Sequence, residues 1–324
     1  MLEHRIEQFC HTLENSVSTF YKVESYAPYA YQIRPQTAQG FDEGLAAITL
    51  MAITHGNEFA GIGVLTRLAK LLLGDQLWFP YPVNLILGNP EAARAGKRYL
   101  EHDLNRAFLA PENASTLEHD RAREISSLLE SSRFFLDFHQ TIEASASPFF
   151  IFPYEPKCYE FARQINVELP IVTHWGKGFS KDGSCTDEFV NRKGGCGISV
   201  ELGQKGFDLA QESVGFYLAL ETLRVVSLRL QNKELEIPQE MSPIYTFAEV
   251  LPYPDASAQL DEGWYNFKEV TKGQKLGRAS EGDIIAPISG PILFPKYRRS
   301  DSGHAIPKEI CRILKRVEED ALGS

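Results

Sequence analysis

An imidazole and a carboxylate stand close together in the stretch THGNE, residues 54–58. His55 and Glu58 are three residues apart, after a run typical of a buried strand and before an apolar run with helical spacing. Both side chains are common ligands of zinc. The alternative is an acidic residue favoured in the first turn of a helix, with a histidine nearby by chance. The HxxE pattern alone leaves both interpretations open.

Two further residues of this kind stand near the ends of predicted strands. His139 follows the apolar run of RFFLDFHQT, and Glu201 follows that of GISVELG. Ligands of open α/β sheets bind at the carboxyl ends of the strands. Two histidines and a glutamate form a zinc set with a fourth position open for water, and a second glutamate can then act as general base. Asp137 suits a partner that orients His139, although His139 could also be a satisfied core histidine.

A polar stretch with little apolar periodicity, GNPEAARAGKRYLEHDLNRAF, covers residues 88–108. It contains Arg98, Asp103, Asn105 and Arg106. Two arginines near an asparagine can hold a carboxylate through forked hydrogen bonds, and one of them can stabilise an oxyanion. The plainer interpretation is a solvated loop followed by the start of a helix.

Strands and helices are predicted to alternate over the first two thirds of the chain, which indicates parallel strands joined by helical crossovers. Strands are predicted over 45–54, 81–90, 133–141, 148–154 and 197–203, and helices over 4–24, 61–74, 115–132, 158–165 and 209–231. After Asn232 the pattern changes to short strand-like runs broken by Gly, Pro and Asp. No long helix is expected there before the last stretch, KEICRILKRVEED. We therefore expect a small β-rich domain over 236–324.

Composition limits the class of protein. The 324 residues carry a formal charge of −10, and 43% of them are hydrophobic. An acidic chain argues against nucleic-acid binding and against binding to anionic membranes. The five cysteines are odd in number and contain no CxxC pair, so a disulfide framework is not expected and a reducing compartment fits. With no signal peptide and no membrane span in view, we expect a soluble, cytoplasmic protein.

Four motifs in one order carry a resemblance to a known family. THGNE, GNPEAARAGKRYLEHDLNRAF, LDFHQT and SVELG resemble the succinylglutamate desuccinylase and aspartoacylase family, which is related to the zinc carboxypeptidases. The resemblance covers residues 45–235 and extends loosely to the C-terminal region. It implies an α/β fold with a zinc carboxypeptidase-like, mixed, mostly parallel sheet flanked by helices. The catalytic domain would span 1–235, and the smaller β-rich domain over 236–324 could cover the cleft.

The resemblance also implies roles for the residues singled out above. His55, Glu58 and His139 would bind one zinc ion per chain. Glu201 would be the general base and later the acid for the leaving amine. Arg98, from the RY before DLNR, would polarise the scissile carbonyl. These implied roles agree with the chemistry that the residue types suggest on their own.

Further residues are implied for substrate binding. Asn105 and Arg106, from DLNR, would hold the carboxylate of the substrate. Arg192 lies nine residues before Glu201, near the place where aspartoacylases have an additional arginine, and it could equally be a surface arginine.

Two more segments resemble parts of the family's substrate site. The stretch GSCTDEF, residues 183–189, resembles the Ser/Thr-rich loop of the desuccinylases, which makes Ser184 and Thr186 candidates for substrate contact. Tyr297, in ILFPKYRR, is the best match to a tyrosine that the C-terminal domain of aspartoacylases contributes.

The sequence thus predicts a zinc-dependent amidohydrolase that removes a succinyl or acetyl group from a small anionic N-acylated amino acid. A planar amide hydrolyses very slowly unaided, so both electrophilic stabilisation and a positioned base are needed. One alternative is a zinc carboxypeptidase that acts on a small peptide. Another is a zinc-binding α/β protein without catalysis. The sequence fixes neither the acyl group nor the amino acid, and it leaves the oligomeric state open.

Overall fold

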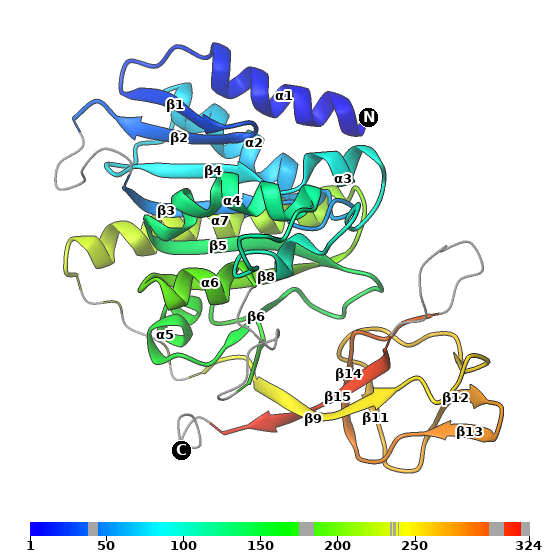
Figure 1. The fold of residues 1–324 in the computed structure, drawn as a ribbon. Coiled ribbons are helices and arrows are strands. Elements are labelled where there is room, and N and C mark those ends of the chain that lie inside the picture. The colour runs from blue at the N-terminus through cyan, green and yellow to red at the C-terminus, as the bar shows by residue number, and fades with distance from the viewer. Residues whose placement is uncertain are drawn as a thin grey trace.

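A mixed sheet of twelve strands forms the backbone of the described structure, and a second sheet of three strands lies at its C-terminal end (Figure 1). The computed structural model describes residues 1–37, 45–174, 185–233, 235, 238, 240–297 and 308–318. The strand order of the large sheet is β1-β2-β4-β3-β5-β8-β6-β7-β9-β15-β14-β11. This arrangement is α/β with a β-rich C-terminal part, as the sequence predicts.

Four parallel strands lie at the centre of the N-terminal part of the chain, residues 1–235. In spatial order they are β4 (Val83–Leu87), β3 (Ala46–Ala52), β5 (Ser132–Thr141) and β8 (Cys196–Gln204). Every residue of β3 and β4 is buried, because helices cover both faces of the sheet and each side chain meets a protein interior. The four strands predicted from these apolar runs are confirmed.

The helices divide between the two faces (Figure 1). One face packs against α1 (Leu2–Asn15), α2 (Ala60–Leu73), α5 (Pro156–Ile165) and α7 (Leu209–Leu230). The other face packs against α4 (Leu117–Glu130) and α6 (Thr186–Arg192). Alternation along a strand separates the two cores, since Leu136 packs with the first group and Phe135 with the second. Two short elements, α3 (Pro90–Arg94) and the 3₁₀ helix η1 (Leu104–Arg106), lie between β4 and α4.

The N-terminal region differs from the prediction of one helix over 4–24. Helix α1 ends at Asn15, and the chain then forms an antiparallel hairpin of β1 (Tyr21–Ala27) and β2 (Ala30–Pro35) at the edge of the sheet. Ser16 is already extended, with φ −75° and ψ 140°. The segment that follows is rich in aromatic and β-branched residues, which favour a strand over a helix.

The large sheet continues into the C-terminal part without a break. Strand β6 (Phe149–Pro153) runs antiparallel to β8, and β7 (Ile171–His174) pairs with β9 (Ile244–Pro252) in parallel. The sheet then adds β15 (Glu309–Val317), β14 (Gly290–Leu293) and β11 (Glu269–Val270). The small sheet contains β10 (Gln259–Leu260), β12 (Lys275–Ala279) and β13 (Gly282–Ile285).

The last stretch of the chain is a strand and not a helix. In KEICRILKRV the apolar residues Ile310, Ile313, Leu314 and Val317 have the spacing of a helical face, which is why a helix could be expected there. Pairing with β9 on one side and β14 on the other makes the segment the strand β15 instead. Tertiary pairing therefore overrides the local pattern.

One buried side chain holds the C-terminal part against the N-terminal part. Asn266, which is fully buried, donates from Nδ2 to the carbonyl oxygens of Glu143 (3.2 Å) and Ala144 (3.0 Å). Its Oδ1 accepts a hydrogen bond from the Phe294 amide at 2.7 Å. The loop that it holds directly follows β5, the strand that carries His139.

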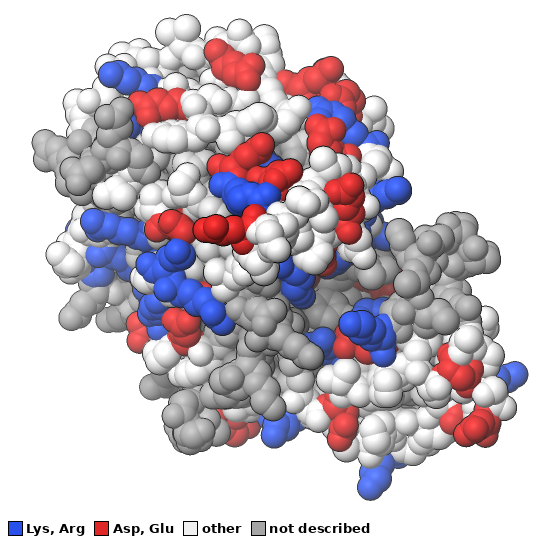
Figure 2. Space-filling view, in the orientation of Figure 1, with Lys and Arg blue, Asp and Glu red and all other residues white. Residues whose placement is uncertain are grey.

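The surface agrees with the charge balance of the sequence. On the face drawn in Figure 2, acidic and basic side chains are interspersed over both parts of the chain and do not gather into one basic surface. Among the described residues, no helix is long and apolar enough to cross a membrane.

Candidate active site

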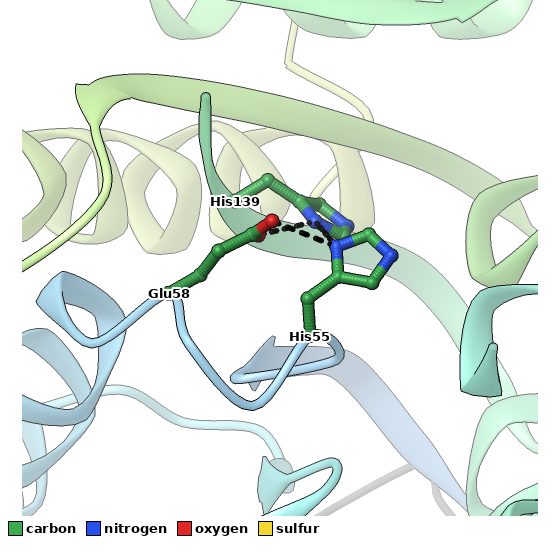
Figure 3. Close-up of side chains that lie close together, drawn as sticks. All are labelled: His55, Glu58 and His139. Atoms are coloured by element: carbon green, nitrogen blue, oxygen red, sulfur yellow. Dashed lines mark hydrogen bonds and ion pairs between the residues drawn. The ribbon is translucent and has the colours of Figure 1, made fainter. Parts of the chain in front are cut away.

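Three potential metal ligands converge at the carboxyl ends of the central strands (Figure 3). His55 and Glu58 lie in the turn after β3, and His139 lies in β5. His55 Nδ1 is 2.9 Å from Glu58 Oε1 and 3.2 Å from His139 Nδ1, and His139 Nδ1 is 3.0 Å from Glu58 Oε2. Ligands about 2.1 Å from a tetrahedral zinc stand about 3.4 Å apart, so the three donors fit one ion after a small outward shift.

The turn between β3 and α2 has a tight backbone conformation that places His55 and Glu58 close together. A Cβ atom on Gly56 would lie 2.4 Å from the backbone of Ala92 and Ala93, so only glycine fits there. The Glu58 amide donates to the carbonyl of His55 at 3.1 Å, which folds the turn back on itself. Phe59, not Glu58, is the N-cap of α2, and the first amide of that helix, of Ala60, donates to Gln140 Oε1 at 3.1 Å. The Glu58 carboxylate instead accepts from the amide of Gln140 at 3.1 Å, so the helix-cap interpretation is not what the structure shows.

Asp137 fixes the orientation of the His139 ring. Its fully buried Oδ2 lies 2.9 Å from His139 Nε2 and accepts hydrogen bonds from the hydroxyls of Thr54 (2.8 Å) and Thr186 (2.7 Å). Burial acts to lower the pKa of His139, but the Asp137 carboxylate outweighs it, and the pKa lies well above its usual value. With Nε2 held by a carboxylate, Nδ1 faces Glu58 and His55, which is the arrangement of a carboxylate-supported metal ligand.

Arg98 and Asp103 flank the other histidine. His55 Nε2 lies 2.6 Å from Arg98 Nη2 and 3.2 Å from Asp103 Oδ1. Arg98 also donates from Nη1 to Glu58 Oε1 at 3.4 Å and pairs with Asp103 Oδ2 at 3.5 Å. Burial opposes the ionisation of Asp103, yet the charges of His55 and Arg98 hold its pKa well below its usual range. The Arg98 side chain is 34% exposed, so its guanidinium can reach a bound molecule.

Asn105 and Arg106 lie on the same loop, in η1. Asn105 Oδ1 accepts from the amide of Thr186 at 2.9 Å, and Arg106 Nη1 donates to the Asn105 carbonyl at 2.5 Å and to Cys185 Sγ at 2.9 Å. Both residues are half-buried. The start of α6 therefore braces the loop beside the ligand cluster.

Glu201 lies next to His139 in the sheet, because the two residues are register partners of β8 and β5. Its Oε2 is buried and has no hydrogen-bond partner among the described residues. Burial and the negative charge of Glu58 disfavour its ionised form and raise its pKa to about 7. A carboxyl group with that pKa can both take up and release a proton near neutral pH.

Thr186 and Arg192 lie elsewhere than the sequence suggests. Thr186 is fully buried, so it supports Asp137 and Asn105 and is not open to a substrate. Arg192 is exposed at the far end of α6, before β8 begins at Cys196. Glu201 lies five residues further along β8, about 16 Å at the usual rise per strand residue. Spacing along the chain placed Arg192 near the glutamate, but the strand direction separates them.

Tyr297 is also occupied elsewhere. Its hydroxyl accepts a hydrogen bond from the Trp264 amide at 2.6 Å and lies 3.1 Å from the Trp264 carbonyl oxygen, so it is held within the C-terminal part. Ser184 lies outside the described residues. The structure also adds Thr54, which supports Asp137 and which sequence reasoning missed. Its place directly before His55 in THGNE was the only signal.

Comparisons with known proteins point to one family. A family model described as the succinylglutamate desuccinylase/aspartoacylase catalytic domain matches residues 45–222. A probable aspartoacylase of Prochlorococcus marinus (strain NATL2A) is 26% identical over 260 residues, covering 76% of this chain and 82% of the relative. A succinylglutamate desuccinylase of Yersinia pestis (strain Pestoides F) is 28% identical over 251 residues, covering 71% and 73%.

The fold is shared with solved structures as well. The crystal structure of the succinylglutamate desuccinylase from Chromobacterium violaceum superimposes with a TM-score of 0.72, at 20% identity, over 96% of this chain and 98% of that chain. The family model spans more than half of the chain and includes all three potential ligands and Glu201. The chain therefore belongs to the succinylglutamate desuccinylase/aspartoacylase family.

Proposed function

We propose that this protein is a zinc-dependent amidohydrolase that cleaves the linear amide bond of an N-acylated amino acid and releases a succinyl or acetyl group. Membership of the family supports the acyl-amino acid substrate, since the relatives above are named for such reactions. The convergence of His55, Glu58 and His139 carries the zinc dependence. Their ligand atoms lie within 4.8 Å of one another, and all three residues are buried.

The residues fit zinc by chemistry as well as by distance. Two imidazoles and one carboxylate form the ligand set of several catalytic zinc sites. When bound there, zinc would supply Lewis-acid chemistry, which acidifies a water molecule and polarises a carbonyl group. His55 Nδ1, the Glu58 carboxylate and His139 Nδ1 would hold it. The same donors also accept cobalt or nickel, so the native metal is part of the proposal.

Glu201 is the proposed proton carrier. Its buried Oε2 has no partner among the described residues and lies beside the His139 strand position, where a nucleophilic water must lose its proton. With a pKa raised to about 7 by burial and Glu58, Glu201 can accept that proton and later give it to the leaving nitrogen. Hydrolysis of the amide then yields a carboxylate and a free amino acid.

Two groups on one loop would recognise the substrate. The Arg98 guanidinium, which is partly exposed beside Glu58, would donate to the oxyanion that forms at the amide carbonyl. Asn105 and Arg106 would hold the carboxylate of the amino acid. This local positive charge attracts an anionic substrate although the chain as a whole carries a charge of −10.

The β-rich segment 236–324 is proposed to cover the cleft and to limit the size of the substrate. Asn266 fastens it to the loop after β5, as described above. The pKa of Lys296 is lowered by burial first, then by the charge of Arg312 and, last, by that of Arg98, which supports a position within electrostatic range of the cleft. All five cysteines are free, which suits the reducing cytoplasm that we propose as the location.

Metal analysis and a substrate panel test this proposal. The purified protein should hold about one zinc per chain and hydrolyse N-succinylglutamate, N-acetylaspartate or another N-acyl amino acid. Glu201→Gln should keep the zinc and lose the activity, whereas Glu221→Gln, which replaces a partly buried glutamate of α7 paired with Arg224, should keep both. Turnover of C-terminal peptide substrates alone would point to a carboxypeptidase. A protein that binds zinc but hydrolyses neither class would support the non-catalytic alternative.

A further inference from the structure

The loop between Arg98 and Asp103 wraps around a buried carboxylate from α4. Glu118, which is 1% exposed, accepts hydrogen bonds from the amides of Leu100 at 2.6 Å, Glu101 at 3.1 Å and His102 at 2.9 Å. The side chain of Asn89 adds a fourth bond at 3.2 Å. One side chain therefore satisfies three successive backbone donors of the loop.

These four hydrogen bonds favour the ionised form of the Glu118 carboxyl group over its neutral form. Successive backbone N–H groups that point to one spot form a concave site for an anion, and here the anion is the chain's own carboxylate. Burial acts to raise the pKa of Glu118, but the donors, Leu100 first among them, lower it below its usual value. Hydrogen bonds to an ionised acceptor are stronger than those between neutral groups, so the loop is held firmly.

The contact is placed between the groups proposed to bind the substrate. Arg98 lies two residues before Leu100, and η1 with Asn105 and Arg106 begins two residues after His102. The same loop is tied to α4 a second time, because Glu101 Oε2 accepts from the amide of Leu117 at 2.8 Å. Helix α4 itself is anchored, because its apolar residues pack in the hydrophobic core on one face of the large sheet.

We propose that Glu118 is a positioning residue, which sets the geometry of the substrate-binding loop through the amides of Leu100–His102. The inference rests on the proposed function, because it assigns Glu118 a role in that reaction. Glu118 is not among the ligand atoms and acts on the substrate only through Arg98, Asn105 and Arg106. Its position in the first turn of α4 is that of any acid favoured at a helix start, so its role cannot be read from the sequence.

The test compares Glu118→Gln with Asp120→Asn. Glutamine at 118 keeps the size of the side chain and one accepting oxygen, but its NH₂ group replaces the other oxygen, so either the amide of Leu100 or the amides of Glu101 and His102 lose their acceptor. Asparagine at 120 also removes one negative charge from the first turn of α4, but the Asp120 side chain is 63% exposed and pairs with Arg123. Hydrogen exchange of the amides of Leu100, Glu101 and His102, zinc content, kcat and KM are measured for both variants and the wild type.

For Glu118→Gln we expect faster exchange at the amides that lose their acceptor, unchanged zinc content, and a KM that rises about tenfold while kcat falls less than about threefold. The KM of the matching substrate carboxamide, which lacks the carboxylate that the loop holds, should change by less than about twofold. Asp120→Asn should behave like the wild type. If Glu118→Gln does not fold, Glu118→Asp, which keeps the charge but shortens its reach, is measured instead and should show the same changes.

Two results would overturn the inference. Unchanged protection of the three amides would show that Glu118 does not order the loop. Lost protection with unaltered KM and kcat would show that the order is irrelevant to the reaction. If the wild type hydrolyses no N-acyl amino acid, the proposed function fails, and the exchange data still support or overturn the anchoring of the loop by Glu118.

Discussion

Replacing Asp137 by asparagine should weaken zinc binding about ten- to a hundredfold, the usual effect of removing a partner that orients a metal ligand. All three ligands remain in Asp137→Asn, so the loss measures what the Asp137 carboxylate adds through its charge and through its hold on the His139 ring. In the structure, Asp137 Oδ2 lies 2.9 Å from His139 Nε2 and accepts hydrogen bonds from the hydroxyls of Thr54 and Thr186. Among the residues that the structure describes, Asp137 Oδ1 contacts only the Thr54 hydroxyl, at 3.0 Å.

The magnitude depends on how the asparagine amide turns. With its oxygen in the Oδ2 position, the bond from His139 survives and only the charge is lost, which predicts the lower end, about tenfold or 1.4 kcal/mol. With its NH₂ group in that position, three donors face another donor, and the His139 ring is no longer held. That case predicts the upper end, about a hundredfold or 2.7 kcal/mol. The hydroxyl of Thr54 can accept from an NH₂ group at the Oδ1 position, so we expect the lower end.

The assay is competition for zinc between the metal-free protein and a chromophoric chelator at pH 7.5. Asp120→Asn, an exposed exchange on α4, is the control, since the Asp120 side chain is 63% exposed and far from the ligands in sequence. Circular dichroism should be identical for the three proteins. An affinity of Asp137→Asn within twofold of the wild type would refute the reasoning, because His139 would then need no carboxylate to serve as a ligand.

Three further predictions follow from the geometry. Glu201→Gln should lower kcat by about 10²–10⁴ and leave the zinc content unchanged, as steady-state kinetics and metal analysis will show, because Glu201 is the base and not a ligand. Arg192→Ala should leave KM within about twofold of the wild type, since its guanidinium lies at the opposite end of β8; a large rise in KM would contradict this placement. Burial and the charge of Glu188 raise the pKa of Asp187 to about 7, above the 3.8 of an unperturbed aspartate, so its contribution to stability is present at low pH and lost as the pH rises through 7. Between pH 6 and pH 8.5, the free energy of unfolding measured in urea should therefore fall by about 1.5 kcal/mol more for the wild type than for Asp187→Asn. An equal fall for both proteins would contradict this prediction.

The site residues near the carboxyl ends of predicted strands could be predicted from the sequence. The apolar runs of β3, β5 and β8 are visible as buried strands. His55 stands beyond the end of β3, and His139 and Glu201 lie close to the carboxyl ends of β5 and β8. Parallel strands in one sheet bring such ends to the same edge, so their convergence follows from the pattern. Asp137 could be assigned as a partner because alternation places it on the same side of the strand as His139.

Residues whose role depends on direction or on tertiary pairing could not be predicted in this way. Arg192 is close to Glu201 in sequence but lies at the opposite end of the strand, which only the course of α6 reveals. Thr186 was expected to face a substrate, and its burial shows that it supports Asp137. Glu118 has the sequence signature of an ordinary acid in a first helical turn. The helix-like spacing of KEICRILKRV yields to pairing with β9 and β14.

The continuous sheet has a consequence for how the protein is made. Strand β9 pairs with β7 on one side and with β15 on the other. The residues of β15, 309–317, are synthesised long after those of β9. While the ribosome is still adding residues beyond β9, the free edge of that strand exposes backbone donors and acceptors that can pair with other chains. A nascent chain therefore needs protection until translation has passed residue 317. A premature stop before Glu309 would leave the catalytic centre encoded in full but the product prone to aggregate.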